Sequence, residues 1–265
     1  NTIGLLRMPY PRGNQKEVAH VQVWAVDPIS LATVTDYAND LYWKPAENAA
    51  AAQAMAEDDP RKKLSEKILT DGKTLIQSKT GNPGIALGIH VSIGNERQRD
   101  GSYRPRYGWF MPENDVTLTV VPVSSQGKIA EPREQIFPVV NEVQTGIYEV
   151  DHNRIYIPLK EGQRLLRLDE APLYDLDAEP DGQGRYPVIG KTPARVTKIL
   201  VRAKQGVSAN SLRAQVETAY ASFSKRINAD PTRNASMPDY VNVLTWEQQL
   251  RDLIAPVEKE REMMR

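Results

Sequence analysis

Short runs of alternating apolar and polar residues dominate the first part of the chain. Residues 18–28 alternate Val21, Val23 and Ala25 with polar or bulky neighbours and end at an Asp-Pro pair, which is typical of a half-buried strand. From residue 84 onward the segments GIALGIHVSIG, DVTLTVVPV, EQIFPVVNEV and NRIYIPL are rich in β-branched residues and are separated by turn residues. These patterns predict a sheet of several short strands.

Two helices are predicted between the first strand and the later ones. Residues 46–59 are alanine-rich, a composition that favours a helix by propensity. The segment that opens at Pro60 places Leu64 and Ile68 four residues apart on one face. Gly72 is expected to end this helix.

The clearest helical pattern lies at residues 211–227. Apolar residues recur there at spacings of four, four, three and four: Leu212, Val216, Tyr220, Phe223 and Ile227. This spacing predicts an amphipathic helix, for which Ser208 is a suitable N-cap. The β-rich segments 196–203 and 240–246 on either side predict strands, so the pattern indicates a β-α-β unit with a polar loop at 228–239.

The end of the chain predicts another amphipathic helix. Thr245 is expected to cap it, and its apolar face is formed by Trp246, Leu250, Leu253, Ile254 and Val257. Residues 258–262, EKERE, are polar on every side, which is typical of a free surface helix or a stalk. Pro256 interrupts the pattern and is expected to kink the helix or end its first part.

Composition narrows the classes of function. The chain has 265 residues, 34 Lys and Arg, 34 Asp and Glu, and no cysteine. A neutral chain gives no reason to expect nucleic acid as a partner. The absence of cysteine excludes disulfides, thiolate nucleophiles and cysteine metal ligands. No stretch reaches the ~20 apolar residues that cross a bilayer. Asn1 and Arg265 are unusual ends for a natural gene product, so we interpret the sequence as an excised soluble fragment of a longer protein.

Residues 148–152, Tyr-Glu-Val-Asp-His, concentrate titratable groups in a short segment. A strand would place Glu149 and Asp151 on one face and His152 on the other, so the three would not converge on a metal or a substrate without a bend. The alternative is a turn between two strands in which Asp151 and Asn153 bond local backbone amides. We favour the turn.

Sequence motifs for catalysis and nucleotide binding are absent. The chain has no G-x-S-x-G elbow, no G-x-x-x-x-G-K-[ST] loop and no G-x-G-x-x-G fingerprint. These absences argue against a catalytic triad and against nucleotide binding by these routes. Our prediction is that the chain is not an enzyme and has no catalytic residue, no cofactor and no metal ligand.

Segment 94–110 has the composition of a partner-binding surface, because arginine and aromatic residues anchor protein interfaces. Its candidate contact residues are Arg97, Arg99, Tyr103, Arg104, Arg106, Tyr107 and Trp109. Asp100-Gly101 marks the tip of a hairpin. The alternative is a solvated hairpin whose aromatic residues pack on its own sheet.

A second candidate loop, residues 122–134, is bracketed by Pro122 and Pro132. It offers Gln126 and Ile129 as contact residues, and Ile129 is its only large apolar residue. We expect a soluble partner to use segment 94–110 more than this loop.

The order of five stretches resembles the extracytoplasmic domain of ABC transporter permeases of the lipoprotein-releasing (Lol) type, in the wider FtsX and MacB superfamily. The stretches are VQVWAVDPISLATVTDYANDL, GIALGIHVSIG, NDVTLTVVPV, FPVVNEVQTGIYEVDHNRIYIPLKEGQRLL and YVNVLTWEQQLRDLIAPVEKEREMM. The fourth is the most similar. The resemblance covers most of 18–42 and 83–265, whereas 46–80 and 94–110 look like additions.

The resemblance implies an α+β fold with two subdomains. Residues 1–190 would form a distal, mixed-sheet sabre-like subdomain, in which 1–17 would be a remnant of the first half of the porter. Residues 191–246 would form the second half of a membrane-proximal, porter-like β-α-β subdomain. Residues 247–265 would be a stalk helix that leads to a membrane span, with Pro256 as its hinge.

The resemblance also implies a function and a location. The chain would be the periplasmic domain of an inner-membrane permease and would transmit ATP-driven motion, in lipoprotein release or related mechanical work. Its partners would be a cytoplasmic ABC ATPase subunit, a second permease copy or paralogue, and a periplasmic carrier or lipoprotein. The competing interpretation is a secreted α+β binding protein or hydrolase with an unrecognised cleft.

Overall fold

The computed structural model divides the chain into two compact units, Asn1–Leu200 and Val201–Arg265. It describes residues 2–10, 16–46, 53, 60–106, 109–122, 129–230, 237–238, 240–251 and 255. Both helices and strands are present, in agreement with the predicted α+β class. Within the described residues, no helix is both long and apolar enough to cross a membrane.

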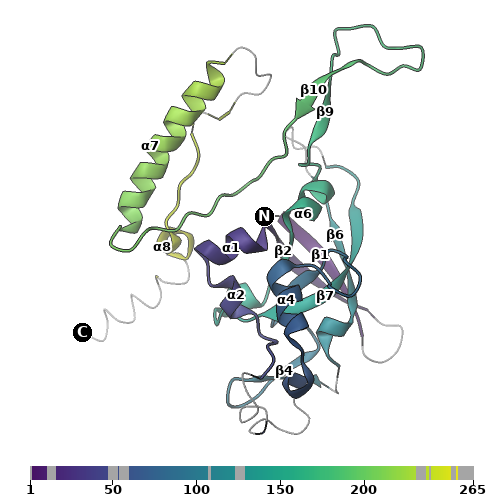
Figure 1. Ribbon diagram of the computed structural model, residues 1–265, viewed down its shortest axis with the longest axis vertical. Helices are drawn as coiled ribbons and strands as arrows, with labels where there is room; N and C mark the ends of the chain where they lie inside the picture. The colour runs from purple at the N-terminus through teal and green to yellow at the C-terminus, as the bar shows by residue number, and fades with distance from the viewer. Residues whose placement is uncertain are drawn as a thin grey trace. The chain divides into compact units, whose positions relative to one another are not determined.

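A closed six-stranded barrel forms the centre of the first unit, in the order β1-β2-β8-β3-β7-β6 (Figure 1). Its strands are β1 (Thr2–Pro9), β2 (Lys16–Val26), β3 (Ile85–Gly88), β6 (Asp115–Val120), β7 (Arg133–Val143) and β8 (Arg154–Pro158). The sheet is mixed, because β2 pairs with β8 and β3 with β7 in parallel, while the other neighbours are antiparallel. β1, which lies within residues 1–17, supplies a strand of this barrel.

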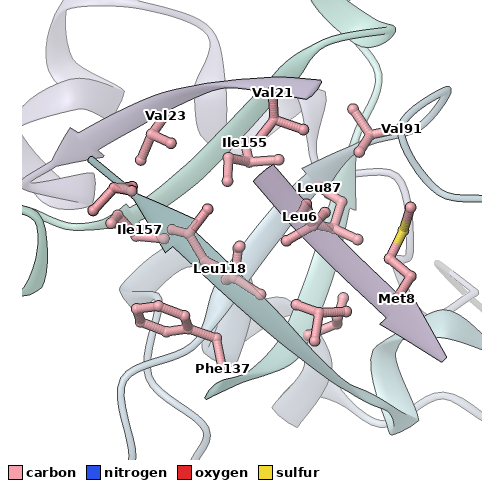
Figure 2. Packing of buried hydrophobic residues seen from close by; sticks show 14 of the residues in the cluster. Leu6, Met8, Val21, Val23, Leu87, Val91, Leu118, Phe137, Ile155 and Ile157 are labelled. Carbon is pink, nitrogen blue, oxygen red and sulfur yellow. The ribbon is translucent and has the colours of Figure 1, made fainter. Parts of the chain in front are cut away.

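Alternating side chains fill the barrel interior. In β1, Leu6 and Met8 point inward and are fully buried, whereas Ile3 and Leu5 are exposed. Figure 2 shows the residues that meet them from the other strands, among them Val21, Val23, Leu87, Leu118, Phe137, Ile155 and Ile157. The period-two pattern of the sequence therefore sets which face of each strand is inside.

A second apolar cluster covers one outer face of the barrel. It contains residues from the strands and from the helices α1 (Pro28–Val34), α2 (Tyr37–Asp40) and α4 (Glu66–Thr74): Trp24, Leu31, Tyr37, Leu41, Leu75, Ala86, Val140, Val143 and Tyr156. β3 is consequently buried on both faces, which explains its unbroken apolar sequence. A short 3-10 helix, η1 (Pro60–Lys63), precedes α4.

The prediction that Gly72 ends the helix after Pro60 is wrong. Gly72 lies inside α4 and is buried, and a side chain there would collide with Asn141. The helix ends at Leu75, which adopts the left-handed conformation with φ 54°. Of the alanine-rich segment 46–59, nearly all lies outside the described residues.

Several smaller elements decorate the barrel. They are β4 (Asn95–Arg97), β5 (Tyr103–Pro105), η3 (Met111–Glu113), α5 (Tyr148–Asp151), α6 (Leu159–Leu166), β9 (Ala171–Tyr174) and β10 (Val188–Thr192). β4 pairs only with β5, and β9 only with β10, so each pair is a separate two-stranded ribbon. Figure 1 shows the β9–β10 ribbon extending away from the barrel.

The second unit is built on α7 (Ala209–Asn228), close to the predicted limits of 211–227. The predicted N-cap is confirmed, because the Ser208 side chain accepts a hydrogen bond from Ser211 N at 3.2 Å. Asn228 holds Met237 through two hydrogen bonds, to its O at 2.9 Å and from its N at 2.7 Å. Thr245 caps α8 (Trp246–Gln249), as predicted, and Gln248 completes a capping box.

The two strands predicted beside α7 are wrong. The described residues 196–203 and 240–245 belong to no strand. A strand needs a neighbour to accept its backbone hydrogen bonds, and neither segment pairs with the other. The predicted β-α-β unit is therefore a helix between two segments that form no strand among the described residues.

Candidate functional site

The predicted hairpin at 94–110 is present as the β4–β5 ribbon. Glu96 pairs with Arg104, and Arg97 with Tyr103. Gly101 takes φ 84° at the tip, and the Asp100 carboxylate accepts hydrogen bonds from Ser102 N at 3.0 Å and Oγ at 2.6 Å. These donors also lower the pKa of Asp100. The hairpin tip at Asp100-Gly101 is therefore confirmed.

All four candidate arginines of this hairpin are exposed: Arg97, Arg99, Arg104 and Arg106. Only two carboxylates, Glu96 and Asp100, lie among them. The Asp100 carboxylate is already engaged at the tip. The hairpin therefore presents an excess of positive charge to solvent, and we call these four residues the arginine surface.

The candidate aromatic residues of the hairpin serve the fold instead. Tyr103 is only 4% exposed, so it is corrected from a contact residue to a core residue. Its N donates to Tyr42 Oη at 2.6 Å, and its Oη lies 2.9 Å from Nε2 of His90. Trp109 is half-buried and packs on the barrel core. Tyr107 lies outside the described residues.

A chain of rings links the hairpin to the Tyr-Glu-Val-Asp-His segment. Neighbouring ring centroids are 4.8 to 5.5 Å apart. In order, the rings belong to Phe110, Trp43, Tyr42, Tyr103, His90, Tyr148 and His152. Tyr148 is 58% exposed and stacks on His152 at an interplanar angle of 10°. No local pattern in the sequence indicates this series of rings, because its members come from separate segments.

The first four residues of the Tyr-Glu-Val-Asp-His segment form the short helix α5, and its last residue, Asp151, is buried. The Asp151 carboxylate accepts hydrogen bonds from Thr145 N at 2.8 Å, Thr145 Oγ1 at 2.7 Å and Gly146 N at 3.0 Å. The predicted bonding of Asp151 to local amides is thus confirmed. No group of three His, Asp or Glu side chains suited to a metal ion occurs among the described residues.

Glu142 is a fully buried carboxyl group in the first unit. It lies in β7 and accepts hydrogen bonds from Trp43 Nε1 and, at 2.7 Å, from Asn95 Nδ2. Burial raises the pKa of Glu142 to about 7, although the neighbouring donors of Ser92, Asn95 and Trp43 oppose the rise. Sequence reasoning missed it, yet the Asn-Glu pair in the apolar run QIFPVVNEV was a usable signal.

The remaining candidates lie elsewhere. Ile129 is 77% exposed and so is available to a partner, as its prediction required. Gln126 and the hinge candidate Pro256 lie outside the described residues. A surface hollow of about 400 Å³ is lined by residues of which only Asp115 is titratable: Gln77, Thr80, Asn82, Pro83, Asp115, Gln135, Ile136 and Pro138. One carboxylate alone does not provide the paired groups of acid–base catalysis.

Comparison with protein-family models and with curated proteins finds no match to this chain.

Proposed function

We propose that the chain is the extracytoplasmic domain of an ABC transporter permease and transmits ATP-driven motion across the membrane, in lipoprotein release or related mechanical work. The order of the five resembling stretches supports the proposal. So does the division into two units near residue 200, since the resemblance implies a distal and a membrane-proximal subdomain. The domain would hydrolyse no ATP itself.

The observation that carries the proposal is the exposed apolar surface of the second unit. Apolar side chains before α7, after α7 and at the start of α8 are exposed: Val201, Val207, Tyr240, Val241, Leu244 and Trp246. Tyr240 is 82% exposed. A group of exposed apolar residues usually marks a surface that another segment or protein covers. Further parts of a larger membrane protein would cover this one.

The barrel suits the distal role. Closure leaves no sheet edge free to pair with other proteins, and apolar clusters fill the interior and cover an outer face. Such a body can be displaced without changing its internal packing. The arginine surface would then be the contact for a periplasmic carrier or lipoprotein, while the ATPase subunit and the second permease copy would act through the rest of the protein.

The test begins with the full-length gene product. We expect it to fractionate with membranes and to copurify with a protein that carries a G-x-x-x-x-G-K-[ST] loop. In proteoliposomes, ATP turnover should require that partner, and the isolated 265-residue chain should show none. A full-length product that is secreted without a membrane segment would refute the proposal and favour the secreted binding protein or hydrolase.

A further inference from the structure

Glu142 attaches the root of the β4–β5 hairpin to the barrel. Its Oε2 accepts a hydrogen bond from Nδ2 of Asn95 at 2.7 Å, and Asn95 is the first residue of β4. The same oxygen accepts the indole N–H of Trp43. One buried carboxyl group thus joins three segments that are far apart in the sequence, and one of them carries the arginine surface.

The second oxygen of each side chain in this pair has no well-formed hydrogen bond. Oε1 of Glu142 and Oδ1 of Asn95 are both buried without a partner of good geometry among the described residues, although the Ser92 hydroxyl lies close enough to Glu142 to lower its pKa. Buried polar atoms without partners are rare, because the loss of hydration is not offset. Two acceptors cannot bond to each other. A proton on Oε1 turns one of them into a donor and can satisfy both.

We propose that Glu142 is a proton-operated clamp on the hairpin. In the protonated form, Asn95 Nδ2–H bonds to Oε2, and Oε1–H of Glu142 bonds to Asn95 Oδ1, so that acid and amide form a closed pair. When the proton leaves to solvent, two acceptors and a negative charge remain in a buried site, and the pair opens. Asn95 and the root of β4 are then released from the barrel.

The groups around Glu142 indicate that the proton on Glu142 itself, and not a neighbouring charge, controls the opening of the hairpin. The charged groups that act on His90 are Asp151, Arg97 and His152, whereas no charged side chain contributes to the pKa shift of Glu142. The pKa of Glu142 is set by burial and by neutral donors, so release is expected near neutral pH. His90 is the competing sensor, because its Nε2 lies 2.9 Å from Tyr103 Oη in β5. Burial lowers the pKa of His90.

This inference goes beyond the proposed function and needs no partner. Only its consequence, that acid pH holds the arginine surface in place for a partner and neutral pH loosens it, rests on the proposed function. The clamp is tested on the isolated chain, whereas the proposed function is tested on the membrane protein, so either can fail without the other.

The test combines NMR of the Glu142 side-chain carboxyl carbon with amide hydrogen exchange between pH 5 and pH 8. Two amides report on opening. Gln98 N donates to Ser102 O near the tip of the hairpin at 2.7 Å, and Arg106 N donates to Gly94 O at its base at 2.6 Å. The Glu142 carbon should titrate near pH 7. The opening constant of the hairpin should rise about tenfold per pH unit up to that value and then level off.

Glu142→Gln supplies the conservative variant, since its amide can donate to Asn95 Oδ1 and accept from Nδ2 at every pH. The opening constant should then stay at the low wild-type value over the whole range. Asn95→Ala removes the partner of Glu142, so the opening constant should be high at acid pH as well and should lose most of its pH dependence. Glu149→Gln, which removes an exposed carboxylate, is the matched control and should behave like the wild type.

Two results would overturn the clamp. One is titration of the Glu142 carbon near 4.5, the ordinary value of a glutamate. The other is a pH dependence of hairpin opening that persists in Glu142→Gln, which would assign the effect to His90. The carbon titration uses the wild-type chain, so the proposal stays testable even if a variant fails to fold.

Discussion

Asn141 holds the main chain of Trp43 from both sides. Its Oδ1 accepts a hydrogen bond from Trp43 N at 3.1 Å, and its Nδ2 donates to Trp43 O at 3.0 Å and to Ile68 O at 3.2 Å. Next to this contact, the chain is attached to β7 by the single bridge between Leu41 and Val143 and by the bond from Tyr42 N to Glu142 O. Beyond the bridge at Leu41, the side chain of Asn141 therefore supplies the hydrogen bonds to the Trp43 backbone that a neighbouring strand would otherwise make.

Replacing Asn141 by alanine should destabilise the first unit strongly. The change leaves the buried N–H and C=O of Trp43 without partners, and each such group costs about 1–3 kcal/mol. We expect the free energy of unfolding, measured in urea, to fall by about 2–4 kcal/mol. Asn82→Ala, at an exposed position, should change it by less than about 0.5 kcal/mol. Equal small effects of both substitutions would show that the hydrogen bonds of Asn141 to Trp43 do not stabilise the first unit.

Gly162 is required for α6 to pack on the barrel. A Cβ at this position would overlap the Cβ of Ala25 in β2. Gly162→Ala should therefore reduce the free energy of unfolding by about 1–3 kcal/mol through overpacking. Gly182→Ala is the matched control, because nothing lies within 4 Å of its added Cβ. Thermal unfolding of the two variants side by side tests the contact, and an unchanged Gly162→Ala midpoint would argue against it.

The sequence predicted best those elements whose signal is local. The pattern of Leu212, Val216 and Tyr220 predicted α7, and the residues that cap helices, Ser208 and Thr245, were correct. Alternation of apolar residues predicted most of the barrel strands. These features depend on side chains within one turn or one strand, so no knowledge of distant segments is needed.

The errors concern pairing and burial, which depend on distant segments. Residues 196–203 have strand-forming composition but find no neighbour, and a single sequence does not reveal which segments pair. Tyr103 was predicted as a contact residue because tyrosine is common in interfaces, yet His90 and Tyr42 enclose it. Closure of the barrel through β1 had no signal in the alternation of its residues alone.

The buried carboxyl group of Glu142 should make stability depend on pH. Its pKa is raised in the folded state to about 7 from about 4.5, so the folded protein binds the proton more tightly than the unfolded chain. Its contribution is greatest below pH 4.5 and is lost as pH rises to about 7. The loss amounts to about 3 kcal/mol.

Urea unfolding of the wild type and Glu142→Gln at several pH values measures this effect. The difference in unfolding free energy between the two proteins should change by about 3 kcal/mol between pH 4.5 and pH 7, in favour of the glutamine at the higher pH. Both proteins share every other titratable group, so the difference cancels their contributions. A difference that does not vary with pH would show that Glu142 is ionised when folded.

Asp151 is expected to stabilise the turn before α5 without binding a metal. Asp151→Ala removes the acceptor of three hydrogen bonds and should reduce the free energy of unfolding by about 2–4 kcal/mol. Zinc or EDTA should leave the melting temperature of the wild type unchanged. A metal bound to the native state would raise stability by about 2.7 kcal/mol at a hundredfold excess over its dissociation constant. A zinc-dependent shift that disappears in His152→Ala would overturn the structural role.

Substitutions of Trp109 and Arg99 should differ in their effect on stability, because Trp109 supports the fold whereas Arg99 is available for contact. Trp109 is half-buried against the barrel core, so Trp109→Ala should reduce the free energy of unfolding by about 2–4 kcal/mol. Arg99 is exposed near the tip, and Arg99→Ala should change stability by less than about 0.5 kcal/mol. Urea unfolding of the isolated chain measures both.

Under the proposed function, Arg99 should also lie closer to a soluble partner than Ile129. A photoactivatable side chain placed at either position in the full-length membrane protein should give more crosslinked partner from position 99, because the arginine surface combines exposure with charge whereas Ile129 offers one apolar side chain. Neither substitution should affect folding, since both side chains are exposed. Stronger crosslinking from position 129 would move the partner contact to the loop between the two prolines.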